Sequence, residues 1–317
     1  MKVQELEQRL MTYLHLRAAL GTAVGSGSKV LESFVAFAGR QGDGGTVTSK
    51  VVFDWLETMK AQQSAGVSAR RLVLVRQFLL HLSAAIPETQ VPHMGLLTGY
   101  KRQTPFLFTP QELELLLKSA ADFRPGEFCS VVLHTILGLI AATGLRASEA
   151  LGLDRPDVMP RNSPNTILIR EAKFGKTRLV PIHDSTAEQL RVYAGHRELL
   201  GFSLHTPAFF VSRHRRRLSY GSLLKSFRIL VQTIGLRARN GSNEPTLHSL
   251  RHSFVVTRLR SWHEAGLDVE TRLAHLATYL GHVDFRETYW YMTATPELLA
   301  AAAVDFAAPA NAGGDNR

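Results

Sequence analysis

Leu247-His248-Ser249-Leu250-Arg251-His252-Ser253-Phe254 places a histidine and an arginine three residues apart, at His248 and Arg251. Side chains at this spacing share one face of a helix. His252 follows His248 by four residues, a spacing that zinc-binding helices also use, but the glutamate that such helices carry is missing. The stretch therefore indicates a helical site made of arginine and histidine, not a zinc site.

Side chains of similar chemistry also occur before and after this stretch. Thr143-Gly144-Leu145-Arg146 puts an arginine just after a Thr-Gly turn, where a helix is predicted to begin. Lys173 lies in a glycine-containing turn between two short β-type runs. His282 ends Tyr279-Leu280-Gly281-His282, and Tyr291 follows it by nine residues.

Such a set suits chemistry on a phosphodiester. Two arginines can grip one phosphate and neutralise its charge, and a lysine can protonate a departing oxygen. Histidines can accept protons or donate hydrogen bonds to phosphoryl oxygens. A tyrosine hydroxyl, with an ordinary pKa near ~10, becomes a nucleophile once its proton is removed. No metal is required, because the arginines can hold the charge that develops on the non-bridging oxygens.

The order of these residues resembles the tyrosine recombinase family, the phage integrases. The resemblance covers about residues 110–300 and rests on Thr143-Gly-Leu-Arg146-x-x-Glu149, Lys173, His248-x-x-Arg251-His252, Leu280-Gly281-His282 and Tyr291. It implies a mainly α fold with a small antiparallel β-sheet. A helical N-terminal core-binding domain would precede an α+β catalytic domain.

The resemblance also implies a role for each residue that would hold the phosphate. Arg146 and Arg251 would clamp the scissile phosphate, and His282 would hydrogen-bond it in the transition state. Glu149 is expected to orient the helix or an arginine.

Three further residues would make and break bonds in this scheme. Tyr291 would attack to form a 3′-phosphotyrosyl intermediate, His248 would help to take its proton, and Lys173 would protonate the departing 5′-hydroxyl. A 5′-hydroxyl from a partner strand would then reverse the step. Because the bond energy stays in the phosphotyrosine, no ATP or other cofactor is expected.

Some assignments have competitors. Lys176 competes with Lys173 because Phe174 stands where the hairpin often has glycine, although the register of the following strand favours Lys173. His252 either supports the site or packs. Tyr289 competes with Tyr291, but the family's spacing from His282 selects Tyr291.

The predicted function is that of a site-specific DNA recombinase or integrase. The 31 residues from Arg251 to His282 and the short chain after Tyr291 resemble recombinases of transposons, which suggests integration, excision or transposition of a mobile element. Two alternatives remain: a non-catalytic sequence-specific DNA-binding protein on the same fold, and a type IB topoisomerase with the same chemistry. A carboxylate-and-metal transposase is a third, but no credible carboxylate triad is found.

Hydrophobic periodicity predicts four helices in the first part of the chain, which we interpret as a core-binding domain over residues 1–88. Residues 89–108, rich in Pro and Gly, are expected to be a linker. Thr109-Pro110-Gln111-Glu112 is a strong helix start. It opens the catalytic domain, expected over 109–308 and followed by a disordered tail over 309–317.

The charge of the chain points to a polyanionic partner. Lysine and arginine number 37 against 27 acids, a net charge of +10. No acid occurs from Leu199 to Asn243. The residues expected to contact DNA phosphates are Arg213, Arg215, Arg216 and Arg217, with Lys101 and Arg102 in the linker.

The remaining composition narrows the setting. One cysteine, Cys129, excludes a disulfide scaffold and a zinc cage. No signal peptide is seen, and the longest apolar run is shorter than the ~20 residues of a membrane span. We therefore expect a cytoplasmic, nucleoid-associated protein without a membrane partner. It is expected to bind a double-stranded recombination site as a homotetramer, and companion recombinases are possible partners. A last helix from Pro296 to about Phe306 is expected to dock on a neighbouring protomer.

Overall fold

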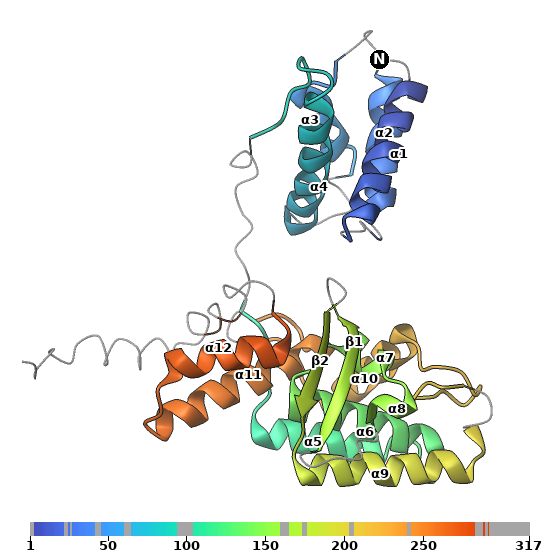
Figure 1. Cartoon of the computed structure of the whole chain (residues 1–317), viewed down its shortest axis with the longest axis vertical. Coiled ribbons are helices and arrows are strands. Elements are labelled where there is room, and N and C mark those ends of the chain that lie inside the picture. Colours follow the sequence, from blue (N-terminus) through green and yellow to red (C-terminus); the bar gives the residue numbers. More distant parts are fainter. Residues whose placement is uncertain are drawn as a thin grey trace, which may run out of the picture. The chain divides into compact units, whose positions relative to one another are not determined.

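The computed structural model describes residues 3–21, 25, 27–41, 46–59, 65–93, 104–158, 165–172, 176–202, 206–239, 242–282, 288 and 291. Over these residues the chain is mainly helical with one two-stranded antiparallel sheet (Figure 1), which confirms the predicted fold class. It divides into two compact units, Met1–Arg102 and Gln103–Arg317. Within the described segments, no helix combines the length and the apolar character needed to cross a bilayer.

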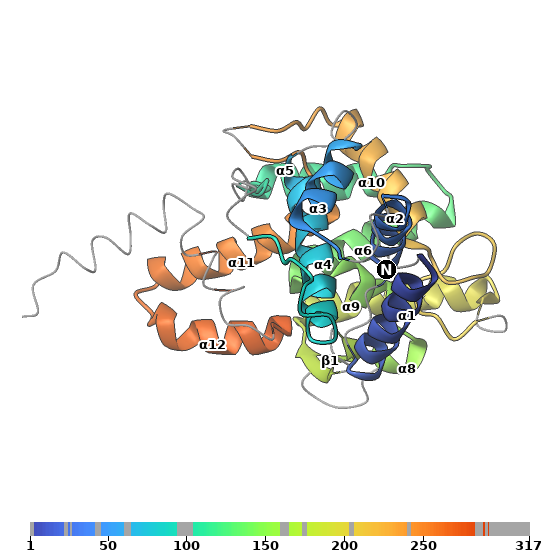
Figure 2. The same ribbon diagram turned by 90° about the horizontal axis from the view of Figure 1, so that it is seen from above.

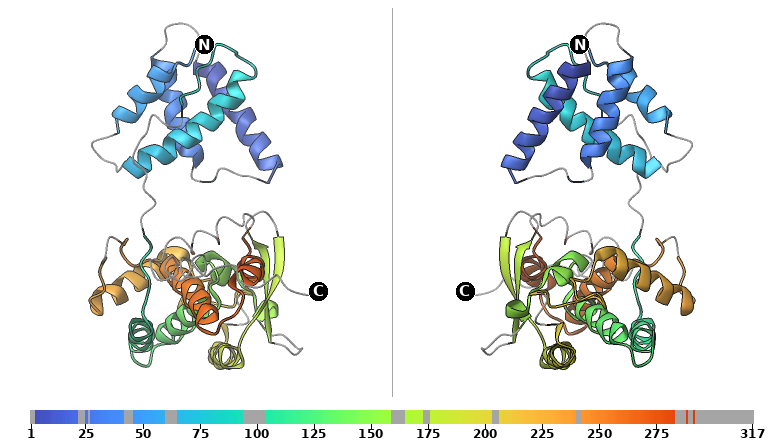
Figure 3. Two further views of the ribbon diagram at one scale, coloured as in Figure 1. Left: turned by 90° about the vertical axis from the view of Figure 1, so that its left-hand side faces the viewer. Right: turned by 90° about the vertical axis from the view of Figure 1, so that its right-hand side faces the viewer.

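The described part of the first unit contains four helices, which pack together (Figure 3). They are α1 (Val3–Ala19), α2 (Gly27–Arg40), α3 (Ser49–Glu57) and α4 (Ala65–Ser83). Each contributes one apolar stripe to a shared core, where Phe34 meets Trp55 edge-on at 5.4 Å between ring centroids. Burial of these stripes explains why four short helices are stable together.

The second unit is built around one helix that is apolar on nearly all sides. This helix is α6 (Phe128–Thr143), and most of its residues are buried. Helices packed against it are α5 (Pro110–Ala121), α7 (Ala147–Gly152), α9 (Asp184–Leu199) and α11 (Leu247–Glu264). The unit also contains α8 (Arg155–Val158), α10 (Tyr220–Thr233) and α12 (Val269–Leu280), and α11 lies beside α12 in Figures 1 and 2.

The sheet of this unit is a hairpin. Strand β1 (Thr166–Ala172) pairs with β2 (Lys176–Pro181), and the register shifts between Ile169 and Ala172. Side chains of β2 alternate, because Val180 is fully buried and Leu179 is 63% exposed. Arg178, two residues before Val180, therefore lies on the inward face.

The predicted linker differs from the structure at both ends. Phe106 and Phe108 are buried in the core of the second unit, and Thr104 pairs with Ser242 in a short parallel bridge. At the other end, the Gln90 amide donates to the Val47 carbonyl. Buried aromatic side chains thus extend the second unit, and a backbone hydrogen bond extends the first, into the Pro- and Gly-containing segment.

Candidate active site

Arg251 is held at the ends of two helices. Its guanidinium donates to the carbonyl of Gly144 (2.6 Å), just after α6, and to that of Leu280 (3.0 Å), the last residue of α12. Gly144 and Gly281 both have left-handed backbone conformations and end their helices there. Carbonyls at helix C-termini carry partial negative charge and stabilise a cation. Burial, and then repulsion from Arg146, lower the pKa of Arg251 to about 10, so it is still protonated at neutral pH.

Glu149 joins two other arginines in the same site. It accepts from Arg178 through both carboxylate oxygens (3.0 Å each), and from the Arg146 guanidinium and backbone amide (3.0 Å each). Burial raises the pKa of Glu149, but the bonds from Arg178 and Arg146 outweigh burial and lower that pKa below its usual value. Glu149 therefore ties the start of α7 to strand β2.

His282 directly follows the α12 cap and contacts Arg251. The Arg251 guanidinium lies 2.7 Å from His282 Nε2, and His282 Nδ1 lies 2.5 Å from Thr288 Oγ1. A guanidinium can only donate, so Nε2 accepts and Nδ1 carries the ring proton. Burial, followed by repulsion from Arg251 and Arg146, lowers the pKa of His282 to about 3. The ring is thus neutral at neutral pH.

The ring of Tyr291 lies in an apolar cluster, and its hydroxyl contacts His252. The residue is 3% exposed and packs among side chains of α11 and α12. Its hydroxyl lies 2.8 Å from His252 Nδ1. His248, one turn earlier on α11, meets the His252 ring edge-on with centroids 4.4 Å apart.

The arrangement favours an anion. Among the described side chains, Arg146, Arg178 and Arg251 contribute three positive charges against the one negative charge of Glu149. Arg146 and Arg251 repel one another, which lowers the pKa of Arg251. An anion between them would relieve that repulsion, and guanidinium groups match the geometry of phosphate oxygens.

Five of the six predicted catalytic residues lie in this neighbourhood: Arg146, His248, Arg251, His282 and Tyr291. Lys173 lies outside the described residues, as do Lys101, Arg102 and Tyr289. Lys176 is the first residue of β2 and pairs with Ala172. The assignment of Lys173 as the acid stays a prediction.

The arginines of the predicted phosphate-binding run have different surroundings. Arg213, Arg215 and Arg216 are exposed in a tight turn before α10. Arg217, whose side chain is 39% exposed, also donates to the carbonyls of Leu151 (2.8 Å) and Leu153 (3.0 Å), and forms an ion pair with Asp154 at 2.5 Å. Arg217 thus fastens the turn to the end of α7, a structural contact that the acid-free local sequence did not indicate.

Two residues of the site were missed in the sequence. Arg178 shares a strand face with buried Val180, so its alternation could have indicated an inward side chain. Thr288, fully buried against His282, gives no comparable signal.

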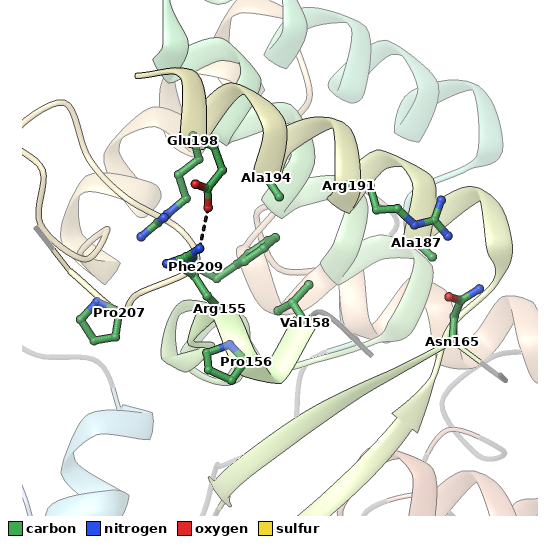
Figure 4. Close-up of a pocket in the computed structure, with 11 residues that line it drawn as sticks. Arg155, Pro156, Val158, Asn165, Ala187, Arg191, Ala194, Glu198, Pro207 and Phe209 are labelled. Carbon is green, nitrogen blue, oxygen red and sulfur yellow. Dashed lines mark hydrogen bonds and ion pairs between the residues drawn. The ribbon is translucent and has the colours of Figure 1, made fainter. Parts of the chain in front are cut away.

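A separate hollow of about 900 Å³ lies beside α9. Figure 4 shows the Arg155–Glu198 ion pair among its lining side chains, none of which belongs to the arginine–histidine site. Over the described part of the chain, no group of three His, Cys, Asp or Glu side chains could hold a metal ion.

Comparison with known sequences identifies the family that this chain resembles. Residues 107–297 match the model of the phage integrase family. An integrase/recombinase of Sinorhizobium fredii, y4rB, is 35% identical over 303 residues, which cover 92% of this chain and 94% of the relative. Tyrosine recombinase XerD of Brucella abortus is 32% identical over 259 residues, 77% of each chain.

Solved structures share the fold. XerH site-specific recombinase bound to its palindromic difH substrate in a post-cleavage complex has a TM-score of 0.66 and 21% identity, covering 89% of this chain and 79% of that one. The Tn1549 transposon integrase in complex with transposon right end DNA has a TM-score of 0.65 and 17% identity, covering 97% and 100%.

Proposed function

The chain belongs to the phage integrase family of tyrosine recombinases, and on that premise we propose that it cuts and rejoins DNA strands through a 3′-phosphotyrosyl intermediate. Membership supports site-specific DNA recombination as the activity. The proposal of a phosphotyrosyl intermediate rests on one observation. Arg146, Arg251, His282 and Tyr291 lie in one site, and the arginines give that site an excess of positive charge.

Phosphate binding would rest on the arginines. Arg251 is fixed by two helix-end carbonyls and Arg146 by Glu149, so both guanidinium groups are oriented before a substrate arrives. Preorganised donors of this kind stabilise the charge that develops in a transition state. His282 would donate to a non-bridging oxygen, which requires that its Nε2 exchange Arg251 for the phosphate and gain a proton. An adjacent anion raises a histidine pKa and so favours this change.

Bond exchange would follow in two reversible steps. The Tyr291 oxygen bonds to phosphorus as the bond to the 5′-oxygen breaks, and Lys173 supplies the proton that the 5′-oxygen takes up. In the second step a 5′-hydroxyl of a partner strand attacks and the tyrosine leaves. The phosphodiester energy is conserved, so the reaction needs no ATP.

A suicide substrate tests the cleavage step. A nick placed beside the scissile phosphate lets the short fragment that carries the new 5′-hydroxyl diffuse away, which traps the covalent adduct. The reaction contains EDTA, and a denaturing gel resolves the adduct. We expect an adduct with wild type and with Tyr289→Phe, and none with Tyr291→Phe. DNA affinity should stay nearly unchanged in both variants, because each loses only one hydroxyl.

The outcomes separate the alternatives. No adduct from wild type on its true site would contradict the recombinase proposal and favour a non-catalytic DNA-binding protein. Relaxation of supercoiled DNA without exchange between two sites would favour a type IB topoisomerase. An adduct that persists in Tyr291→Phe and is lost in Tyr289→Phe would reassign the nucleophile.

Full exchange of two duplexes would require four protomers on DNA, since four strands are cut. We propose that the last helix, predicted from Pro296 to about Phe306, docks on a neighbouring protomer. Truncation after Ala294 should then abolish exchange between paired sites, and exchange that survives truncation would remove this proposal. A role in a mobile element would be supported by terminal inverted repeats and neighbouring recombinase genes in the flanking DNA.

A further inference from the structure

The hydroxyl of Tyr291 has a defined polar partner. His252 Nδ1 lies 2.8 Å from the Tyr291 oxygen, and the two rings are tilted by 53° with centroids 5.4 Å apart. The distance is that of a strong hydrogen bond. His252 immediately follows Arg251 on α11, so the residue that contacts the hydroxyl is covalently adjacent to the residue whose guanidinium contacts His282.

Packing alone explains the position of the ring but not the contact at its polar end. The phenol ring lies among Val255, Val256 and Leu259 of α11 and apolar side chains of α12. A buried hydroxyl needs a partner, yet a backbone carbonyl or a serine would serve equally well. Imidazole differs from those groups because it can take the proton away at neutral pH.

The surroundings favour loss of the phenol proton. A negative charge on the Tyr291 oxygen would raise the pKa of Arg251 by attraction, and the same attraction stabilises the phenolate. The ordinary pKa of imidazole is about 6.5 and that of phenol about 10, so the transfer is uphill in water without this help. Cation and base thus act on the same oxygen.

Resting on the proposed cleavage function, we infer that His252 is a catalytic residue that accepts the Tyr291 hydroxyl proton through Nδ1. As the bond from the tyrosine oxygen to phosphorus forms and the bond to the 5′-oxygen breaks, the proton moves to neutral His252, which becomes an imidazolium. In rejoining, the imidazolium returns the proton to the departing tyrosine. His248, edge-on to the His252 ring, positions it for this transfer.

Two amide substitutions test which ring nitrogen matters. The asparagine amide lies near the place of Nδ1 in histidine, whereas the glutamine amide reaches the place of Nε2. Neither amide can accept a proton, so on the nicked substrate we expect all three variants to be slow, with His252→Gln and His252→Ala about 100-fold or more slower than wild type. His252→Asn, which can keep a hydrogen bond at the place of Nδ1, should be the fastest of the three. His275 on α12 lies outside the site and provides a matched control, so His275→Gln should cleave at the wild-type rate.

A sulfur-substituted substrate separates loss of the base from loss of the acid. When the 5′-bridging oxygen is replaced by sulfur, the leaving thiolate needs no proton. Lys173→Ala should therefore recover on this substrate, and His252→Ala should remain slow. Thermal melting and DNA affinity of each variant, measured alongside, establish that the slow variants are folded and bind.

These experiments can contradict the role of His252 as the base independently of the recombinase proposal. If His252→Ala cleaves at the wild-type rate, His252 only packs. If His248→Ala is the slow variant on the sulfur substrate and His252→Ala is not, the base is His248. Failure of the recombinase proposal would appear instead as no adduct from the wild-type chain.

Discussion

At the scale of single residues, two glycines shape the arginine site. Gly144 (φ +66°) and Gly281 (φ +67°) end the helices whose terminal carbonyls meet guanidinium groups, and neither has room for a side chain. A Cβ on Gly144 would lie 2.5 Å from the Phe254 ring, and one on Gly281 would lie 2.7 Å from Arg178. Backbone geometry at these two positions is thus part of the site.

Alanine at these glycines should therefore cost more than the left-handed conformation alone. Gly266 (φ +64°) serves as the matched control, because a Cβ there would meet nothing within 4 Å. We expect Gly266→Ala to lose about 1 kcal/mol of unfolding free energy, and Gly144→Ala about 1–3 kcal/mol more because of the ring contact. Urea denaturation of both variants measures the difference, and equal losses would contradict the steric argument.

His282 should make stability depend on pH. Its pKa is about 3 in the folded chain and near its ordinary 6.5 when unfolded. As the pH falls from 7 to 5, the unfolded state takes up a proton that the folded state does not, so the free energy of unfolding decreases. This contribution is present above the unfolded pKa and is lost progressively toward the folded one.

The variant His282→Gln should flatten that dependence. Denaturation at pH 7 and pH 5 gives the loss for wild type and variant, and the difference isolates His282 from the other histidines. Glu149 is present in both proteins, so its own proton uptake cancels in this difference. Identical pH dependence in both proteins would mean that His282 is not held neutral by its surroundings.

At the scale of elements, Arg178 connects three parts of the site. It lies on β2, binds Glu149 of α7 through two bonds, and donates through Nε to the Tyr279 carbonyl near the end of α12 (3.0 Å). Its side chain is 14% exposed and that of Glu149 5%. The hairpin that leads to Lys173 is therefore attached to the elements that carry Arg146 and His282.

Removal of Arg178 should leave a buried carboxylate only partly compensated. We expect Arg178→Met to lose about 3 kcal/mol of unfolding free energy, and Arg178→Lys to lose less, since one ammonium cannot replace all three bonds but keeps the charge. The double variant Arg178→Met/Glu149→Met should lose less than the sum of the single variants by about 1–3 kcal/mol. Strict additivity in this cycle would show that the pair is not coupled.

The elements themselves were largely predictable, whereas the contacts between them were not. Hydrophobic periodicity located the helices of the first unit, and β-type runs located both strands. Arg251, however, binds a carbonyl 107 residues away in the chain, at Gly144. A main-chain carbonyl carries no sequence signature, so this partner follows only from tertiary packing.

The same reason explains which site residues the motif order shared with the family could predict and which it could not. It named Arg146, Arg251, His282 and Tyr291 together, and these lie together. It left His252 open, because His248 and His252 share a face of α11 and only packing decides which one meets the tyrosine.

At the scale of the whole molecule, charge determines how the chain should meet DNA. The net charge of +10 favours binding to any duplex through phosphate contacts and release of counterions. Sequence preference must come from other contacts, because phosphates carry no base identity. In the basic run before α10, arginines that could contact phosphates can be distinguished from Arg217, which holds the turn to the end of α7.

This difference between the arginines should appear in the salt dependence of DNA binding. Arg215, Arg216 and Arg217 are all exposed, but Arg217 also binds Asp154 and two carbonyls that hold the turn to α7, so the run should not act as a unit. If Arg215 and Arg216 each meet a phosphate, Arg215→Ala/Arg216→Ala should lower the slope of log affinity against log salt by about 2, since each contact contributes about 0.9. Arg217→Ala should leave the slope nearly unchanged and lower the melting temperature, and Asp154→Ala should resemble it. Titration of a labelled duplex at several salt concentrations measures the slopes.

An unchanged slope in the double variant would place Arg215 and Arg216 on a face that does not meet DNA. A reduced slope in Arg217→Ala would mean that Arg217 exchanges Asp154 for a phosphate when the complex forms.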